Sequence, residues 1–133
     1  MRTAEINKWI DEGGSIPEDL TQEEKDHLTK LGWSVEEEWH PNGQKWCEQH
    51  FLHGKEHGQK ERWYENGQKD YEHHFFHGKH HGKQEGWYED GQKKCEHHCF
   101  HGMKHGVFKE WYEDGNLFRG EEYYYGNKIK KTS

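Results

Sequence analysis

The sequence predicts a mainly β protein, built as a single elongated antiparallel sheet of 24-residue β-hairpin repeats with a short N-terminal helical cap. Two observations carry this prediction. Tryptophan recurs with a fixed period of 24 residues, at Trp39, Trp63, Trp87 and Trp111. Glycine follows the same period and falls every few residues, which excludes a helix because each interior glycine destabilises one by about 1 kcal/mol. We divide the chain into a cap, residues 1–38, and four repeats, residues 39–62, 63–86, 87–110 and 111–131.

The cap is predicted to begin with a short helix. Ile6, Trp9 and Ile10 are spaced to lie on one helix face, and Gly13-Gly14 ends the pattern. A second helix has two candidate starts with capping-box spacing, at Ser15–Glu18 and at Thr21–Glu24.

The second helix carries an apolar stripe that runs to Leu31, and Gly32 ends it. Because an open sheet edge invites aggregation, we expect the cap to pack on the first repeat near Trp39 and Trp46. The alternative is that this segment grips a partner.

Each repeat is predicted to contain one tight hairpin turn and one longer connection. Asn66-Gly67 is typical of a type I′ turn, in which both central residues have positive φ. Gly78–Gly82 is interpreted as the longer, glycine-bounded turn. Four such units predict about eight strands. We expect a thin aromatic core in which Trp63 and Trp87 share one face with Tyr71.

Composition limits the partners. The chain is 28% hydrophobic and 34% charged, but its 15% of aromatic residues argues for a folded sheet. A net charge of −7 disfavours nucleic acid and anionic membrane, which both need a basic patch. No apolar run reaches the ~20 residues of a membrane span. Three cysteines with no feasible disulfide within the monomer favour the cytoplasm.

Histidine is concentrated in the repeats, with 13 of 14 between His40 and His105. A histidine near the end of each of the first three repeats is expected to bond its own turn; these are His57, His81 and His105. Cys95, His97 and Cys99 are weak metal-ligand candidates, because neighbours on one strand face lie about 7 Å apart. We therefore expect no metal site and no cofactor.

Catalysis has little support in the repeats. Serine and threonine are absent between Trp39 and Lys131. Glu48, Glu72 and Glu96 recur at one strand position, which predicts a ladder against lysines rather than an acid–base pair. The chain is therefore predicted not to be an enzyme.

The repeat unit resembles the MORN family (membrane occupation and recognition nexus), in its bacterial and viral variant. Segments 63–82 and 87–106 match a pattern close to W-Y-E-N-G-Q-x-K…F-x-x-G-K-x-H-G nearly throughout. Segment 39–58 matches with His40-Pro41 in place of Tyr-Glu, and segment 111–126 lacks the closing His-Gly. The resemblance implies a hairpin-repeat fold and a binding role, and some proteins of this variant are described as antitoxins of the YwqK type.

The predicted function is a non-enzymatic protein-binding module that inhibits its partner, in an antitoxin-like or viral or phage counter-defence role. The alternative is a small-molecule or lipid-headgroup binder that uses a concave aromatic and histidine face, which includes peripheral lipid contact. Self-association is also compatible with the sequence. The candidate binding residues are Trp63, Tyr64, Trp87, Tyr88, Trp111, Tyr112, His74 and His98.

Overall fold

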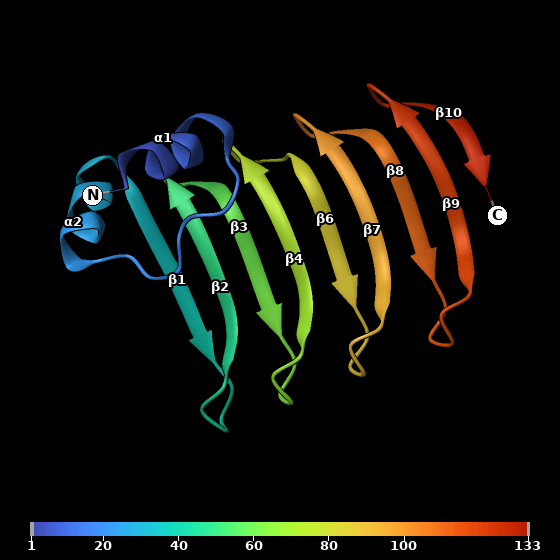
Figure 1. The fold of residues 1–133 in the computed structure, drawn as a ribbon, viewed down its shortest axis with the longest axis horizontal. Helices are drawn as coiled ribbons and strands as arrows, with labels where there is room; N and C mark the ends of the chain where they lie inside the picture. Colours follow the sequence, from blue (N-terminus) through green and yellow to red (C-terminus); the bar gives the residue numbers. More distant parts are fainter. Residues whose placement is uncertain (1, 133) are drawn as a thin grey trace.

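The chain forms one ten-stranded sheet preceded by two short helices, in a computed structural model that describes residues 2–132 (Figure 1). The helices are α1 (Thr3–Glu12) and α2 (Gln22–Lys30). The strands are β1 (Trp33–Trp39), β2 (Lys45–Leu52), β3 (Lys55–Trp63), β4 (Lys69–Phe76), β5 (Lys79–His80), β6 (Gly82–Trp87), β7 (Lys93–Phe100), β8 (Met103–Trp111), β9 (Leu117–Tyr124) and β10 (Asn127–Thr132).

The sheet is a meander in which the strands lie in chain order, and every pairing is antiparallel. β5 is a two-residue strand that pairs with β4 beside the main path. The prediction of a single antiparallel sheet with N-terminal helices is confirmed. The sheet begins at Trp33 rather than at Trp39, so β1 lies within the segment that the sequence assigned to the cap. This strand and the split between β5 and β6 raise the strand count from the predicted eight to ten.

Each repeat has its two-residue turn at the position predicted for the longer connection, and its longer loop at the position predicted for the tight turn. Gly67 has the predicted positive φ of 87°, but Asn66 does not have one. Its loop is closed by the Gly67 amide donating to the Tyr64 carbonyl, a three-residue hairpin with glycine in the left-handed position. Both central residues have positive φ at His77-Gly78 instead, with values of 47° and 84°.

The predicted long connection at 78–82 is therefore wrong. Phe76 pairs directly with Lys79, so the chain reverses within two residues at His77-Gly78. Sequence reasoning missed this turn because histidine is a less familiar left-handed residue than asparagine, although it is among the side chains enriched there.

The cap has two helices, and the second starts at the later of its two candidate positions. The Thr21 hydroxyl accepts a hydrogen bond from the Glu24 amide, and the Glu24 carboxylate accepts one from the Thr21 amide. Arg2 donates three further bonds to this buried carboxylate, one from its amide and two from its guanidinium. The Ser15 start is not used, and Ile16 is instead buried against the sheet.

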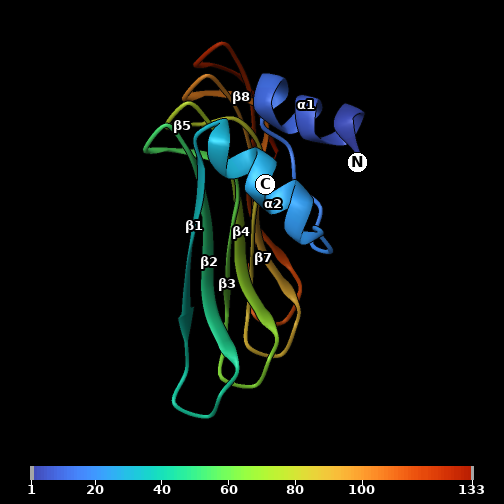
Figure 2. The same cartoon turned by 90° about the vertical axis from the view of Figure 1, so that its left-hand side faces the viewer.

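The buried apolar core lies between the helices and one end of the sheet, and Figure 2 shows both helices on the same side. Its members come from the helices, the linker after α1 and the first two strands: Ile6, Trp9, Ile16, Leu28, Trp33 and Leu52. The predicted contacts with Trp39 and Trp46 are not made: Trp39 is 58% exposed, and Trp46 contacts Arg62. The prediction that Trp63 and Tyr71 share one face of the sheet is also wrong. Trp63 lies near Lys69, which pairs with Glu72. Tyr71 precedes Glu72 on β4, so it lies on the opposite face, where it contacts Arg62.

Polar contacts fix α1 on β3. His57 is fully buried and its Nε2 donates to the Trp9 and Ile10 carbonyls, at 2.7 and 3.0 Å. The Gln59 side chain accepts from the Ile16 amide and donates to its carbonyl. These bonds require close approach, and a Cβ placed on Gly58 would lie 2.1 Å from Trp9 Nε1.

Gly58→Ala should therefore destabilise the fold more than Gly43→Ala. Both glycines have nearly the same positive φ, 87° and 89°, so both substitutions share a conformational cost of roughly 1–2 kcal/mol. A Cβ on Gly43 meets nothing within 4 Å, whereas the clash at Gly58 adds about 1–3 kcal/mol. Urea unfolding of the two variants measures the difference, and equal midpoints would contradict the docking of α1 on β3.

Candidate functional site

The face of the sheet that carries the helices, here the inner face, holds a repeated Lys–Glu–His motif. The first motif is Lys45–Glu48–His50, in which Glu48 accepts from Lys45 Nζ at 2.6 Å and from His50 Nε2 at 2.9 Å. The same contacts recur one and two repeats later, in Lys69–Glu72–His74 and Lys93–Glu96–His98. The predicted glutamate ladder against lysines is confirmed.

These hydrogen bonds hold the three glutamates in their ionised form. The bond from His50 is the main cause that lowers the pKa of Glu48 to about 2, and that from His74 does the same for Glu72. For Glu96, the leading cause of a pKa of about 2 is Lys93. In each Lys–Glu–His motif the lysine therefore neutralises the charge of the glutamate at neutral pH. Two of the predicted binding residues, His74 and His98, belong to these motifs.

A second set of side chains bonds each repeat to the next at the loops that contain the Asn-Gly and Asp-Gly pairs, here the lower loops. The Tyr64 hydroxyl donates to the Trp87 carbonyl, and the Tyr88 hydroxyl donates to the Trp111 carbonyl, both at 2.7 Å. His40 takes the tyrosine position in the first repeat, and its Nε2 donates to the Trp63 carbonyl at 2.8 Å. Tyr64 and Tyr88, predicted to bind a partner, thus bond their own chain.

Histidine side chains join the two-residue turns at the other end of the strands, such as His77-Gly78, here the upper hairpins. Nδ1 of His57 accepts from the His77 amide at 3.2 Å, and Nδ1 of His81 accepts from the His101 amide at 3.0 Å. His105 accepts from the Tyr125 amide at 2.9 Å. The prediction that each histidine bonds its own turn is wrong, since each reaches the turn 20 residues further along the chain.

The opposite face of the sheet, here the open face, is not covered by either helix (Figure 2). It carries two groups of aromatic and cationic side chains. In the first, Arg62 lies over the rings of Trp46 and Tyr71, and Tyr71 stacks on His73 at 4.3 Å.

The second open-face group lies on β7–β9, and β6 separates it from the first group in the sheet. His97 stacks on Phe108 at 4.4 Å with an interplanar angle of 5°. Phe108 meets the Tyr123 ring at 5.2 Å, and Lys104 lies over both rings.

The weak metal candidates do not form a site. Within residues 2–132 no three histidine, cysteine or acidic side chains are grouped to hold a metal ion. Cys95 and Cys99 are free thiols, and burial raises the pKa of each. His97 stacks on Phe108, and its Nε2 has no hydrogen-bond partner within residues 2–132.

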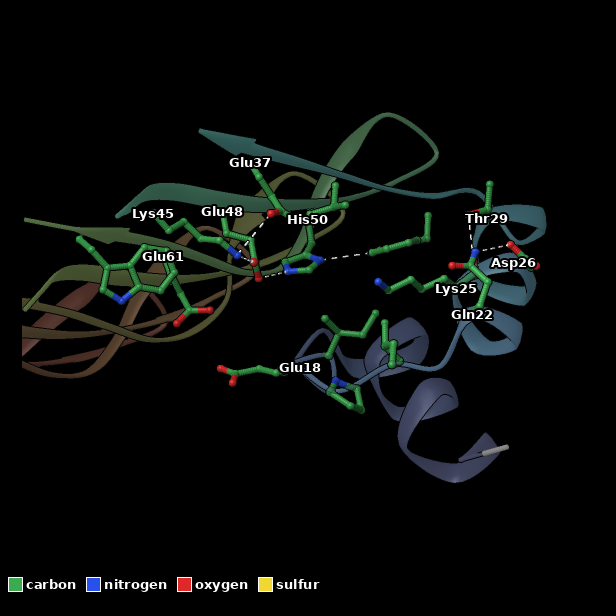
Figure 3. Close-up of a pocket in the computed structure, with 16 residues that line it drawn as sticks. Glu18, Gln22, Lys25, Asp26, Thr29, Glu37, Lys45, Glu48, His50 and Glu61 are labelled. Atoms are coloured by element: carbon green, nitrogen blue, oxygen red, sulfur yellow. Dashed lines mark hydrogen bonds and ion pairs between the residues drawn. The ribbon is translucent and has the colours of Figure 1, made fainter. Parts of the chain in front are cut away.

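A cleft of about 640 Å³ lies between the cap and the inner face of β1–β3 (Figure 3). The motif of the first repeat forms part of its wall, and the Trp33 indole donates to His50 Nδ1 at 3.2 Å. Trp63 also lines it, the only one of the predicted binding residues that does so. Sequence analysis missed the cleft because it needs the cap and the sheet together, and no periodic signal marks their junction.

Of the other predicted binding residues, Tyr88, Trp111 and Tyr112 line one hollow of about 410 Å³. Trp87 and Trp111 are half-buried, and their carbonyls accept the tyrosine bonds described above. Tyr112 is 52% exposed beside Phe118, with a ring separation of 5.0 Å.

Three segments of the chain match the family model of the MORN repeat variant: residues 56–77, 81–98 and 104–119. Each lies over a strand–loop–strand unit that contains one of the Asn-Gly or Asp-Gly loops. MORN repeats are generally protein- or membrane-binding modules. Neither the curated proteins nor the solved structures gave a match. In residues 2–132 no helix is both long and apolar enough to cross a membrane.

Tyr64→Phe should destabilise the sheet by about 0.5–1.5 kcal/mol, because the Trp87 carbonyl loses its hydroxyl donor. Tyr112→Phe is the matched control, since this tyrosine makes no hydroxyl hydrogen bond within residues 2–132. Thermal melts of both variants give the comparison. Equal shifts would show that the inter-repeat bond does not stabilise the fold.

Stability should fall as the pH falls from about 6.5 towards 4. Burial is the main cause that lowers the pKa of His73 to about 4, and it lowers those of His57, His81 and His97. Unfolded histidine titrates near 6.5, so the unfolded chain binds more protons than the folded chain in this window. Acid therefore favours unfolding.

Urea midpoints at pH 7.5, 6.5, 5.5 and 4.5 test this expectation, and His73→Phe should reduce their slope. A wild-type midpoint that rises or stays level on acidification would contradict burial as the dominant effect.

Proposed function

We propose that this chain is a non-enzymatic module that binds a protein partner on the open face of its sheet. The observation that carries the proposal is the pair of aromatic and cationic groups on that face, around Tyr71 and around Phe108. Tyrosine, tryptophan and arginine are the residues most enriched among interface hot spots. Stacking already restricts these rings, so binding would cost them little further side-chain entropy.

The inner face is less suited to a large partner. Its N-terminal end lies beneath the helices, and its lysines and glutamates neutralise each other in the repeated motifs. The open face instead spans the strands from β2 to β9 without a second layer, which matches the extended surfaces that repeat proteins use.

The finer role that we propose is inhibition of the bound protein, in an antitoxin-like or viral counter-defence setting and in the cytoplasm. Three free cysteines support a reducing compartment. The absence of clustered nucleophiles in the repeats supports a role by occupancy rather than by chemistry.

Affinity capture with immobilised protein tests the proposal. Wild-type protein should retain a stoichiometric partner, and Tyr71→Ala and Tyr123→Ala should each weaken its binding at least tenfold. Lys83→Ala is the control, because this lysine pairs with Glu85 and Glu96 of the inner face. Addition of the chain to the purified partner then measures inhibition.

Two outcomes would contradict the proposal. Equal retention of the partner by the tyrosine variants would place the interface elsewhere. A tightly held small molecule with no protein partner would favour the alternative function, a small-molecule or lipid-headgroup binder.

A further inference from the structure

The cleft beneath the cap has the size and the mixed lining of a ligand site. Its volume, about 640 Å³, falls in the range of roughly 300–1,000 Å³ that is usual for small-molecule pockets. Leu20, Trp33 and Val35 provide apolar wall on the side of the cap and the first strand. Charged side chains line both the cap and the sheet, and Figure 3 shows Glu18, Lys25 and Glu48 around the space between them.

The charge of the cleft is strongly acidic. Five carboxylates line it against two lysines: Glu18, Asp26, Glu37, Glu48 and Glu61, with Lys25 and Lys45. Lys45 is already committed, because it bridges Glu37 at 3.3 Å and Glu48 at 2.6 Å. Lys69 lies outside the lining but pairs with Glu61, so the five carboxylates still outnumber these three lysines, and the net charge favours a cation.

Glu61 is the residue that gives the cleft a specific anchor. It is only 5% exposed, yet its carboxylate is directed from β3 into the cleft (Figure 3). Lys69 donates to Oε2 at 2.8 Å, and within residues 2–132 no hydrogen bond reaches Oε1. Lys69 thus bonds only one of the two oxygens, and Oε1 is left to accept a hydrogen bond from a cation that enters the cleft. The Trp63 ring lies on the same wall and offers a surface for cation–π contact.

We propose that this cleft binds an organic cation, an ammonium or guanidinium group on an apolar body. The cation would meet Glu61, and the apolar body would lie against Trp33 and Val35. The group can belong to a free small molecule or to a lysine or arginine side chain of a peptide. This site is separate from the open face, so it stands whether or not a protein partner binds there.

Isothermal titration calorimetry of the full chain tests the proposal with three probes of the same shape. Phenethylammonium should bind at least tenfold more tightly than neutral 2-phenylethanol and anionic phenylacetate. N-acetyl-lysine methylamide tests the peptide source of the same chemistry. Whichever amine binds more tightly identifies the source, and binding of either supports the site.

Matched variants locate the binding. Glu61→Gln should weaken phenethylammonium at least tenfold, whereas Glu85→Gln should not change its affinity. Glu85 is the equivalent residue one repeat later and bonds Lys93 at 2.8 Å, but it lies outside the cleft. Thr29→Trp adds bulk at the exposed rim of α2 and should also abolish binding, without a change to the buried core.

A melting curve of each variant confirms that it is folded. Equal affinities for phenethylammonium and phenylacetate, or no binding of any amine, would overturn the proposal. So would equal effects of Glu61→Gln and Glu85→Gln.

Discussion

The sheet depends on hydrogen bonds that side chains of one repeat make to the main chain of the next. Most of its length has no second layer, so apolar burial is concentrated at the capped end, around Trp9 and Leu28. Beyond that end, Tyr64 and Tyr88 join the lower loops while His81 and His105 join the upper hairpins. A period of 24 residues is thus a structural requirement, since each donor must meet the same acceptor in every copy.

This requirement separates the structural residues from those left for a partner. The sequence suggested a binding surface that included Tyr64, Tyr88, His74 and His98, but each of these side chains has an acceptor within the chain. Side chains with fewer such hydrogen bonds lie on the open face, as around Phe108, and in the cleft, where no donor from residues 2–132 reaches Oε1 of Glu61. Recurrence along the chain therefore marks the scaffold more reliably than it marks the site.

The sequence predicted the architecture well and the sites poorly, for physical reasons. Periodic tryptophan and glycine are enough to define hairpin repeats, and the stripe of Ile6, Trp9 and Ile10 was enough to place α1. Turn type was not predicted. A two-residue turn with positive φ at both central residues was expected at Asn66-Gly67, but it lies at His77-Gly78. The cleft was not predicted, because it depends on how a non-repeating cap lies on the first strands.

The histidines show the same limit at the level of one bond. The spacing could indicate that His81 accepts a hydrogen bond from a turn. Only the twist and stacking of the repeats decide that the donor is the His101 amide, in the next turn along the chain. Hydrogen exchange of that amide at pH 7.5 tests this inter-repeat bonding most directly. We predict that it is protected in the wild-type chain and loses protection in His81→Phe, while the His77 amide, which is bonded to His57, keeps its protection. A His101 amide that exchanges freely in the wild-type chain would contradict the account.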